Sequence, residues 1–311
     1  MTLLRIAIIG YGHISRTRHI PVIAESGQFE VTAIVSESLA EPPPGCRLYR
    51  THRELLADGK DIDAVAINTP PAPRYAIARD ALLAGKHVFL EKPSTATLGE
   101  IAALRDLAER SEASLFATWH SHHNAAVDEA RLLLANRKVK TLHTVWHEDV
   151  DRWHPGQQWI WQAGGLGVFD AGSNAISILT KVLPERALVK SSTFVVEAGR
   201  AAPVAAKIAL AIGDASEDLL VDLDWRVKQD QRFITITCED GTELSLTDSG
   251  RTLHVDGHES IREANLEYPR LYERFKALID SGSDDVDIEP MRVIADAFLM
   301  AQWDTVARTT S

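Results

Sequence analysis

The chain opens with a short apolar segment that runs directly into a glycine-rich turn. Leu3–Ile9 is followed by Gly10-Tyr11-Gly12-His13-Ile14-Ser15 and then by a stretch of helical character. A strand, a Gly-x-Gly turn and a helix in this order are typical of a dinucleotide-binding turn, because the glycines let the backbone approach a pyrophosphate. Ser15 stands where a third glycine or alanine is usual. The opening therefore predicts a Rossmann unit with Gly10, Gly12, His13 and Ile14 at a cofactor.

The first third of the chain alternates between strand-like and helix-like segments. Further apolar runs lie at Phe29–Val35, Ala64–Ile67, Val88–Leu90 and Leu115–Ala117. Helix-like stretches between them are Arg53–Ala57, Pro73–Leu83 and Leu98–Glu109. This rhythm predicts an α/β fold with a doubly wound parallel sheet and right-handed crossovers. Thr97 and Glu100 have capping-box spacing, which predicts a helix start just beyond the fourth strand.

A charged pair ends that fourth strand. Glu91-Lys92-Pro93 follows the apolar run His87–Leu90, and parallel sheets bind ligands beyond the carboxyl ends of their strands. Charges there are costly unless they act on a ligand, so we predict nicotinamide chemistry beside Lys92, with Glu91 also at the cofactor. Asn68-Thr69-Pro70-Pro71 ends the third strand at the same edge and predicts a rigid wall for a ring or ribose. The alternative is a simple strand terminator.

The end of the second strand bears on the choice of cofactor. Ser36 and Glu37 lie about 20 residues past the glycine turn, where the ribose is read. An acid accepts hydrogen bonds from ribose hydroxyls, whereas an arginine would pair with a 2′-phosphate, and no arginine follows immediately. We therefore expect NAD to be preferred, with NADP use left open. The alternative is that Glu37 points into solvent.

The pattern changes after Ser121. Residues 140–149 read as a strand and 172–182 as a helix, and strands then predominate at Arg186–Glu197, Val204–Ile212, Asp218–Val227, Phe233–Cys238 and Glu243–Leu246. Two-residue alternation with turns such as Asp240-Gly241 predicts a large, mostly antiparallel open sheet in an α+β domain. The tail Pro290–Val306 has helical periodicity. We expect a Rossmann domain over 1–121 and a substrate-binding and oligomerisation domain over 122–311, with helix 290–306 able to pack back on the first.

Composition excludes several classes of protein. The 311 residues include 33 basic and 44 acidic side chains, a net charge of −11, so nucleic acid is not an expected partner. Cys46 and Cys238 are two lone thiols, and the first residues resemble neither a signal sequence nor a membrane span. We expect a cytoplasmic protein. His120-Ser121-His122-His123 lacks further ligands at zinc spacing, so no metal is expected and His120 is a candidate hydrogen-bond partner of the substrate.

A second constellation lies at Gly164–Asn174. Asp170 and Asn174 are four residues apart and share one helical face, where a carboxylate and a carboxamide could bind a hydroxyl and take its proton. The alternative is that Asp170 only caps a helix start. Five of the seven tryptophans fall between Trp119 and Trp161. They predict a polyol pocket, because sugar C–H faces pack on indole rings, although a tryptophan-rich core explains any one of them equally well.

These residues together resemble the glucose–fructose oxidoreductase/inositol dehydrogenase (Gfo/Idh/MocA) family across nearly the whole chain. The matching marks are Gly10-Tyr11-Gly12, His19-Ile20-Pro21, Thr69-Pro70-Pro71, Glu91-Lys92-Pro93 and Gly164–Asp170. Within the family, Thr118–Ser121, Arg152–Trp161 and Gly164–Asn174 look like bacterial L-arabinose/D-galactose 1-dehydrogenases. The resemblance implies NAD(P)-dependent oxidation of the anomeric hydroxyl of an aldose to the lactone.

The resemblance also implies residue roles. Many family members carry a histidine base where this chain has Asn174, so Asp170 takes the role of base, Lys92 stabilises charge on the reacting oxygen, and Asn174 orients the hydroxyl. Substrate contacts are implied for His120, Glu148, Trp153 and Trp225.

Two rival functions stay open at this point. One is a dehydrogenase of inositol or another secondary alcohol, and the other is a sensor that binds cofactor and sugar without turnover. An open sheet would expose apolar surface in a monomer, so we also expect a homo-oligomer built on it.

Overall fold

The computed structural model describes residues 3–59, 61–213 and 219–308 of the chain. These residues form two compact units. The first runs to His120 and takes in Glu267–Ile288, and the second comprises Ser121–Leu266 and the residues from Glu289 onward. The division expected from the sequence, 1–121 and 122–311, did not provide for the return of residues 267–288 to the first unit.

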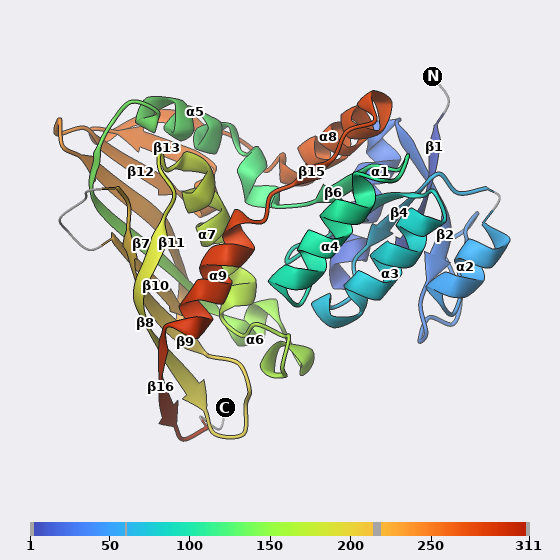
Figure 1. The fold of residues 1–311 in the computed structure, drawn as a ribbon, viewed down its shortest axis with the longest axis horizontal. Coiled ribbons are helices and arrows are strands. Elements are labelled where there is room, and N and C mark those ends of the chain that lie inside the picture. Colours follow the sequence, from blue (N-terminus) through green and yellow to red (C-terminus); the bar gives the residue numbers. More distant parts are fainter. Residues whose placement is uncertain (1–2, 60, 214–218, 309–311) are drawn as a thin grey trace. The chain divides into compact units, whose positions relative to one another are not determined.

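The first unit is built on a parallel sheet (Figure 1). Its described strands follow the order β15-β6-β5-β4-β1-β2-β3, and every neighbouring pair is parallel. Their bounds are Leu4–Ile9 (β1), Phe29–Val35 (β2), Arg47–Tyr49 (β3), Ala64–Ile67 (β4), His87–Leu90 (β5), Leu115–Ala117 (β6) and Asp285–Val286 (β15). The strand order reverses between β1 and β4, the switch point at which such sheets bind ligands. The predicted doubly wound sheet is confirmed.

Helices cover both faces of this sheet. They are Ile20–Ser26 (α1), which follows a short π-type turn at Ser15–His19, His52–Asp58 (α2), Pro71–Leu83 (α3), Leu98–Ala108 (α4) and Glu267–Ser281 (α8). The capping box is confirmed, since Thr97 and Glu100 exchange hydrogen bonds at the start of α4. Helix α8 comes from the return segment and buries Tyr272 and Phe275 against the sheet residue Phe89. The first unit therefore needs residues from late in the chain to complete one of its cores.

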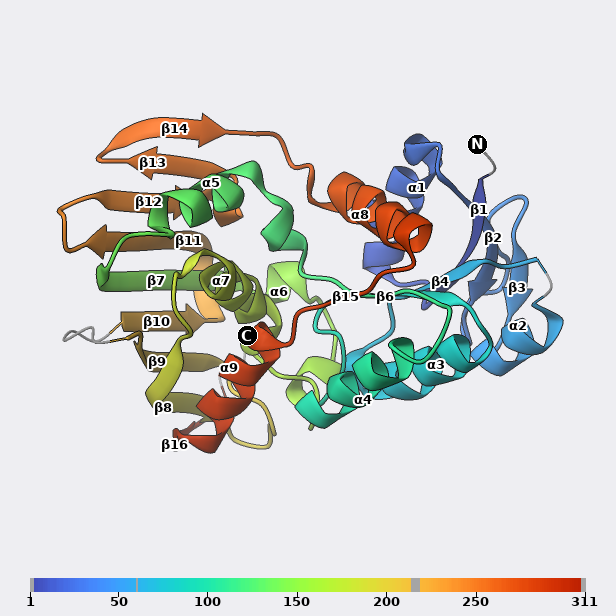
Figure 2. The ribbon, with the colours of Figure 1, turned by 45° about the horizontal axis from the view of Figure 1, so that its top comes forward.

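The second unit contains a larger, mixed sheet (Figure 2). Its described strands follow the order β14-β13-β12-β11-β7-β10-β9-β8-β16, with parallel pairing only in β7–β10 and β8–β16. Their bounds are Val139–Asp149 (β7), Leu188–Glu197 (β8), Ala205–Ala211 (β9), Leu219–Asp224 (β10), Arg226–Cys238 (β11), Glu243–Thr247 (β12), Thr252–Val255 (β13), His258–Arg262 (β14) and Ala301–Val306 (β16). The predicted mostly antiparallel sheet is confirmed.

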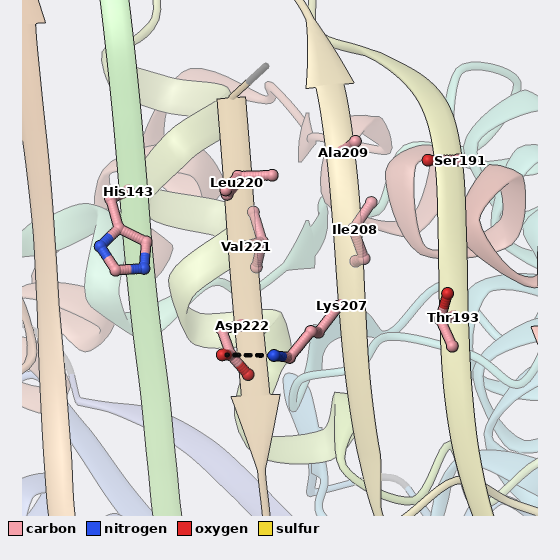
Figure 3. A pocket seen from close by; sticks show the side chains of 9 residues that line it. All are labelled: His143, Ser191, Thr193, Lys207, Ile208, Ala209, Leu220, Val221 and Asp222. Atoms are coloured by element: carbon pink, nitrogen blue, oxygen red, sulfur yellow. Dashed lines mark ion pairs between the residues drawn. The ribbon is translucent and has the colours of Figure 1, made fainter. Parts of the chain in front are cut away.

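One face of this sheet carries the helices of the unit. They are Ala125–Leu134 (α5), Val150–Trp153 (α6), Phe169–Val182 (α7) and Glu289–Leu299 (α9), with short 3₁₀ turns at His120–His123, Trp159–Trp161 and Asp248–Gly250. The opposite face presents Leu188, Leu220 and Phe233 among polar side chains, and Leu188 and Leu220 are 56% and 47% exposed. Figure 3 shows a hollow on strands β7–β10, where Lys207 pairs with Asp222 at 3.7 Å.

Two predictions for this half of the chain were inaccurate. The tail is not one helix over 290–306, because α9 ends at Leu299 and residues 301–306 form strand β16. Strand β16 forms hydrogen bonds with the otherwise unpaired backbone edge of β8. The helical periodicity of the tail sequence does not reveal this tertiary pairing. Helix α9 packs on α7 and β8 within the second unit. The strand expected at 218–227 is interrupted at Trp225, and residue 218 lies outside the described residues.

Candidate active site

The glycine turn after β1 joins the carboxyl ends of three strands. Gly10 has φ of +94°, and a Cβ there would stand 2.8 Å from the Thr69 nitrogen, so only glycine fits. Its N–H donates to the Val35 carbonyl at the end of β2. Gly12 and the neighbouring His13 are exposed, and a Cβ on Gly12 would meet no described atom within 4 Å. The first glycine shapes the turn, and the second leaves the backbone approachable.

Ser15 explains why the third glycine is dispensable here. Its hydroxyl is buried and donates to the Gly10 carbonyl at 2.6 Å, while the Asn68 amide donates to the same hydroxyl at 3.0 Å. Ile14 is half-buried next to it. The serine side chain thus closes the turn against the end of β4, a contact that glycine would not make.

The segment after β4 continues this edge of the sheet. Pro70 is exposed and caps α3, and Pro71 is the first, buried residue of that helix. The Asn68 Oδ1 and Thr69 Oγ1 atoms are buried and have no hydrogen-bond partner among the described residues. Polar atoms without partners at a switch point are consistent with a site that a ligand completes. The residues present therefore fit a dinucleotide along the ends of β1, β2 and β4.

The loop after β2 has a feature that the sequence analysis missed. Glu37 is exposed, and the Ser36 hydroxyl accepts from the Leu39 N–H at 3.2 Å. Arg50, which follows β3, donates from Nη1 to the carbonyl oxygens of Ser36, Glu37 and Leu39 at 3.2, 3.3 and 2.7 Å. An arginine therefore lies on the loop where the sequence predicts that the ribose is read, brought there by strand β3 and not by proximity in sequence.

A buried guanidinium shapes the turn that carries Lys92. Arg74 on α3 donates to the Thr69 carbonyl at 2.8 Å and to the carbonyls of Glu91 and Pro93. It is 5% exposed. Lys92 itself is half-buried at the carboxyl edge of β5. The sequence did not single out Arg74, because nothing about one arginine in a helix indicates that it donates to three main-chain carbonyls.

Glu91 is the centre of a buried polar cluster in the first unit. Its carboxylate accepts the Lys92 N–H at 2.6 Å and the Tyr268 hydroxyl at 2.5 Å, and it lies 3.3 Å from the His19 Nε2. His19 is fully buried and its Nδ1 lies 2.7 Å from the Tyr272 hydroxyl. Glu91 therefore supports the Lys92 turn, and its contact with the cofactor stays a prediction.

The charge state of this cluster follows from its contacts. Burial alone would raise the pKa of Glu91, but the hydrogen bond and positive charge of His19, the charge of His120 and the Tyr268 hydroxyl together bring that pKa well below its usual range. Burial and the neighbouring Glu91 charge raise the pKa of Tyr268 far above its usual value. Glu91 is thus an ionised carboxylate surrounded by donors.

His120 belongs to the same unit. Its Nδ1 lies 3.1 Å from a Glu267 carboxylate oxygen at the start of α8. Burial by itself would lower the pKa of His120, but the charge and hydrogen bond of Glu267 raise it above the ordinary value. Trp119, by contrast, is a structural tryptophan, since its indole donates to the Asp287 carbonyl at 2.9 Å.

In the second unit, close packing places the start of α7. A Cβ on Gly165 would stand 2.0 Å from the Trp159 carbonyl oxygen, and one on Gly167 would stand 2.2 Å from the Pro203 carbonyl oxygen. These contacts hold the loop so that α7 starts with Asp170 in its first turn, 5% exposed, and Asn174 one turn later, half-buried. The helix thus begins at Phe169, earlier than predicted.

A histidine outside the predicted set accompanies Asp170. The His154 Nε2 lies 3.4 Å from an Asp170 carboxylate oxygen, and its Nδ1 lies 3.4 Å from the Gln157 side-chain oxygen. The His154 ring is 5.0 Å from the ring of Trp225. Trp225 is 1% exposed, and its indole N–H has no partner among the described residues. This group combines a buried carboxylate with a donor that a ligand could satisfy.

The remaining predicted substrate residues lie around the end of β7. Glu148 is 6% exposed, accepts the Trp146 indole N–H at 2.9 Å and lies 2.9 Å from the Arg232 guanidinium. The Trp153 indole donates to Asp230 at 2.9 Å, and its ring is 42% exposed. Trp153 is therefore tethered at one end and open to solvent at the other.

The described residues contain neither a metal-binding cluster nor a membrane-spanning helix. No three His, Cys, Asp or Glu side chains are grouped so that they could hold a metal ion. No helix there has the length and apolarity needed to cross a membrane. His122 contacts the Ser177 carbonyl at 2.8 Å.

Comparisons with known proteins agree with this architecture. Residues 4–118 match the family described as "Oxidoreductase family, NAD-binding Rossmann fold". A galactose 1-dehydrogenase from Pseudomonas fluorescens is 37% identical over 298 residues, which cover 96% of this chain and 95% of the relative. A D-galactose-1-dehydrogenase protein from Rhizobium etli has a crystal structure with a TM-score of 0.92 and 41% identity, covering 100% of this chain and 99% of that one.

A more distant structure shares the fold alone. It is a 3-ketoreductase from Actinomadura kijaniata in complex with NADP and TDP-benzene, with a TM-score of 0.85 at 18% identity, covering 98% of this chain and 100% of that one. The parallel sheet and its glycine turn define an oxidoreductase with an NAD-binding Rossmann unit. The chain belongs to the Gfo/Idh/MocA family of oxidoreductases.

Proposed function

We propose that the protein oxidises the anomeric hydroxyl of an aldose, D-galactose or L-arabinose, to the lactone with NAD or NADP as hydride acceptor. The observation that carries the proposal is the buried Asp170 carboxylate, paired with His154, beside the indole N–H of Trp225, which has no partner among the described residues. It gains support from two galactose dehydrogenases that are 37% and 41% identical over nearly the full chain.

In the proposed mechanism, a bound nicotinamide dinucleotide supplies the acceptor for the hydride that leaves C1 of the sugar. The Asp170 carboxylate takes the proton of the C1 hydroxyl, so that loss of one hydride and one proton converts the hemiacetal to the lactone. A hemiacetal hydroxyl is more acidic than an ordinary alcohol, so a carboxylate suffices as base. His154 holds Asp170, and Gln157 holds His154 in turn.

Other residues of the chain orient the sugar in this proposal. The Lys92 ammonium stabilises the negative charge that develops on the C1 oxygen, and Asn174 hydrogen-bonds to the same hydroxyl. His120, Glu148, Trp153 and Trp225 bind the remaining hydroxyls and the apolar sugar face. D-Galactose has a hydroxymethyl group that L-arabinose lacks, a difference that pockets discriminate only modestly.

For the cofactor, we propose that the Gly10–Gly12 turn binds the pyrophosphate and that the Asn68–Pro71 segment lines the nicotinamide side. Glu37 accepts hydrogen bonds from the ribose hydroxyls, which favours NAD. This assignment rests on the exposed position of Glu37 at the end of β2.

The test is turnover by purified protein with D-galactose, L-arabinose, D-glucose, D-xylose and myo-inositol against each cofactor. Galactose or arabinose should be turned over fastest, and Asp170→Asn should lower kcat by about 10²- to 10⁴-fold with dinucleotide affinity unchanged. Asp80→Asn is the matched control, because Asp80 forms another aspartate–histidine pair, 3.1 Å from His52, away from the proposed site and the proposed association face. Turnover of inositol alone, or tight NAD binding without turnover, would refute the proposal.

We also propose that the helix-free face of the second unit is where two copies of the chain associate. Leu188, Leu220 and Phe233 on this face support the proposal, because a sheet that is covered on one side only leaves apolar area in water. Sedimentation of the wild type and of Leu220→Glu tests it. The wild type should sediment as an oligomer and the variant as a smaller species, and a monomeric wild type would end the proposal.

A further inference from the structure

The end of β2 carries a cation that is fixed in place by the main chain. The Nη1 atom of Arg50 donates to three carbonyls of one loop, those of Ser36, Glu37 and Leu39. Strand β3 brings Arg50 there, since the Ser36 N–H donates to the carbonyl of Tyr49, the residue before Arg50. The guanidinium therefore has a defined position on the loop that reads the adenosine ribose in folds of this type.

The charge of Arg50 is not neutralised within the described part of the chain. Two arginines close to Arg50 in the sequence form ion pairs. Arg47 lies 3.4 Å from Asp58, and Arg53 lies 3.7 Å from Asp80. No carboxylate of residues 3–59, 61–213 or 219–308 is in ion-pair contact with the Arg50 guanidinium, and the nearby Glu54 accepts only its main-chain N–H, at 2.9 Å. All acceptors of its side chain are carbonyl oxygens.

An arginine in this state is suited to binding a phosphate group. Its Nη2 and Nε atoms have no hydrogen bond to a described residue, and a guanidinium offers donors in a planar fork that matches phosphate oxygens. Arg50 is exposed, so a ligand can reach it. Anchoring by the carbonyls also removes part of the side-chain entropy that binding would otherwise cost.

We propose that Arg50 binds the 2′-phosphate of NADP and so makes NADP a working cofactor alongside NAD. The inference rests on the proposed dinucleotide site but not on the identity of the sugar. Glu37 and Arg50 then act on alternative ligands at one place. The Glu37 carboxylate accepts from the free ribose hydroxyls of NAD, and the Arg50 guanidinium offsets the repulsion between that carboxylate and the 2′-phosphate.

The experiment separates phosphate binding from catalysis by using cofactor fragments. Calorimetry measures the affinity of adenosine 2′,5′-bisphosphate and of adenosine 5′-monophosphate for the wild type, Arg50→Gln, Arg50→Lys and Arg47→Gln. Arg50→Gln should lower the affinity for the bisphosphate by about 10- to 100-fold and the affinity for the monophosphate by less than about twofold. Arg50→Lys should recover part of the loss. Arg47→Gln is the matched control, because Arg47 is exposed on β3 and paired with Asp58.

The outcomes distinguish this inference from the proposed sugar oxidation. Equal weakening of both fragments would overturn it, because Arg50 would then only shape the loop, and so would unchanged binding of both. Failure of both fragments to bind would overturn the dinucleotide site and the inference together. The expected fragment pattern in a protein that oxidises no sugar would support Arg50 and refute the sugar reaction alone. With an active enzyme, Arg50→Gln should lower the ratio of kcat/KM for NADP to that for NAD by the same factor.

Discussion

Replacement of Glu91 by glutamine tests whether an ionised carboxylate holds the Lys92 turn. Glu91 is 4% exposed and accepts two short hydrogen bonds, from the Lys92 N–H at 2.6 Å and from the Tyr268 hydroxyl at 2.5 Å. Hydrogen bonds to charged groups contribute about 1.5–3 kcal/mol each, and neutral ones about half of that. Glutamine keeps the shape but loses the charge and one of the two acceptor oxygens, so the first unit should lose about 2 kcal/mol at pH 7.

The pH dependence of this loss is the sharper part of the prediction. The pKa of Glu91 in the folded protein is lowered from its ordinary value of 4.5. Its contribution to stability is therefore complete above pH 4.5 and declines as the pH falls below that value, where only the unfolded chain takes up the proton. At pH 3.5 the decline is about 1.4 kcal/mol. The difference between the wild type and Glu91→Gln should shrink from about 2 to under about 1 kcal/mol.

The assay is urea unfolding at pH 7 and pH 3.5, with hydrogen–deuterium exchange of peptides from the first unit as the readout. Following these peptides alone keeps the transition of the second unit out of the measurement. Glu25→Gln, an exposed carboxylate on α1, is the control and should leave stability unchanged at both pH values. An equal stability loss for Glu91→Gln at pH 7 and pH 3.5 would refute the reasoning, because the role of Glu91 would then not depend on its charge.

Three further predictions follow from individual contacts. Gly165→Ala should destabilise the second unit by about 3 kcal/mol or more in urea unfolding, because its Cβ would overlap the Trp159 carbonyl oxygen, and a stable variant would contradict the packing. Arg74→Met should cost the first unit about 3 kcal/mol in the same measurement, because three main-chain oxygens, two of them in buried hydrogen bonds, lose the guanidinium donor. The pKa of His120 is raised from 6.5 by Glu267, so its contribution is complete below pH 6.5 and is lost as the pH rises through the folded pKa. His120→Gln should flatten that decline in thermal unfolding between pH 6.5 and 9, and an unchanged slope would exclude the pair as its cause.

Local sequence patterns were sufficient to predict much of the secondary structure of the first unit. The runs Phe29–Val35, Ala64–Ile67 and Leu115–Ala117 became strands with the predicted bounds, and the Thr97 capping box starts α4. Each of these features depends on residues within a few positions of one another, where sequence periodicity and side-chain chemistry act directly. The glycine turn after β1 is of the same kind, since its backbone conformation requires glycine at position 10.

Contacts between residues far apart in sequence set the limits of such reasoning. The tail Ala301–Val306 forms a strand because the edge of β8 was open for pairing. Ala301 pairs with Ser192, which lies 109 residues earlier in the chain. Its own residues gave no reason to abandon the helical pattern that α9 follows as far as Leu299. Which strand edge stays open depends on how all the other strands of the sheet are paired, and this is a property of the whole unit.

The sequence by itself determined the class of fold, the glycine turn, and the residues Lys92 and Asp170 as the candidates for chemistry. The tertiary structure decided which side chains support them. Tyr268 reaches Glu91 across 177 residues, Arg50 reaches the loop after β2, and His154 reaches Asp170. These partners are fixed by chain closure and by the need of each buried polar group for a hydrogen bond, and neither constraint leaves a periodic signal in the sequence.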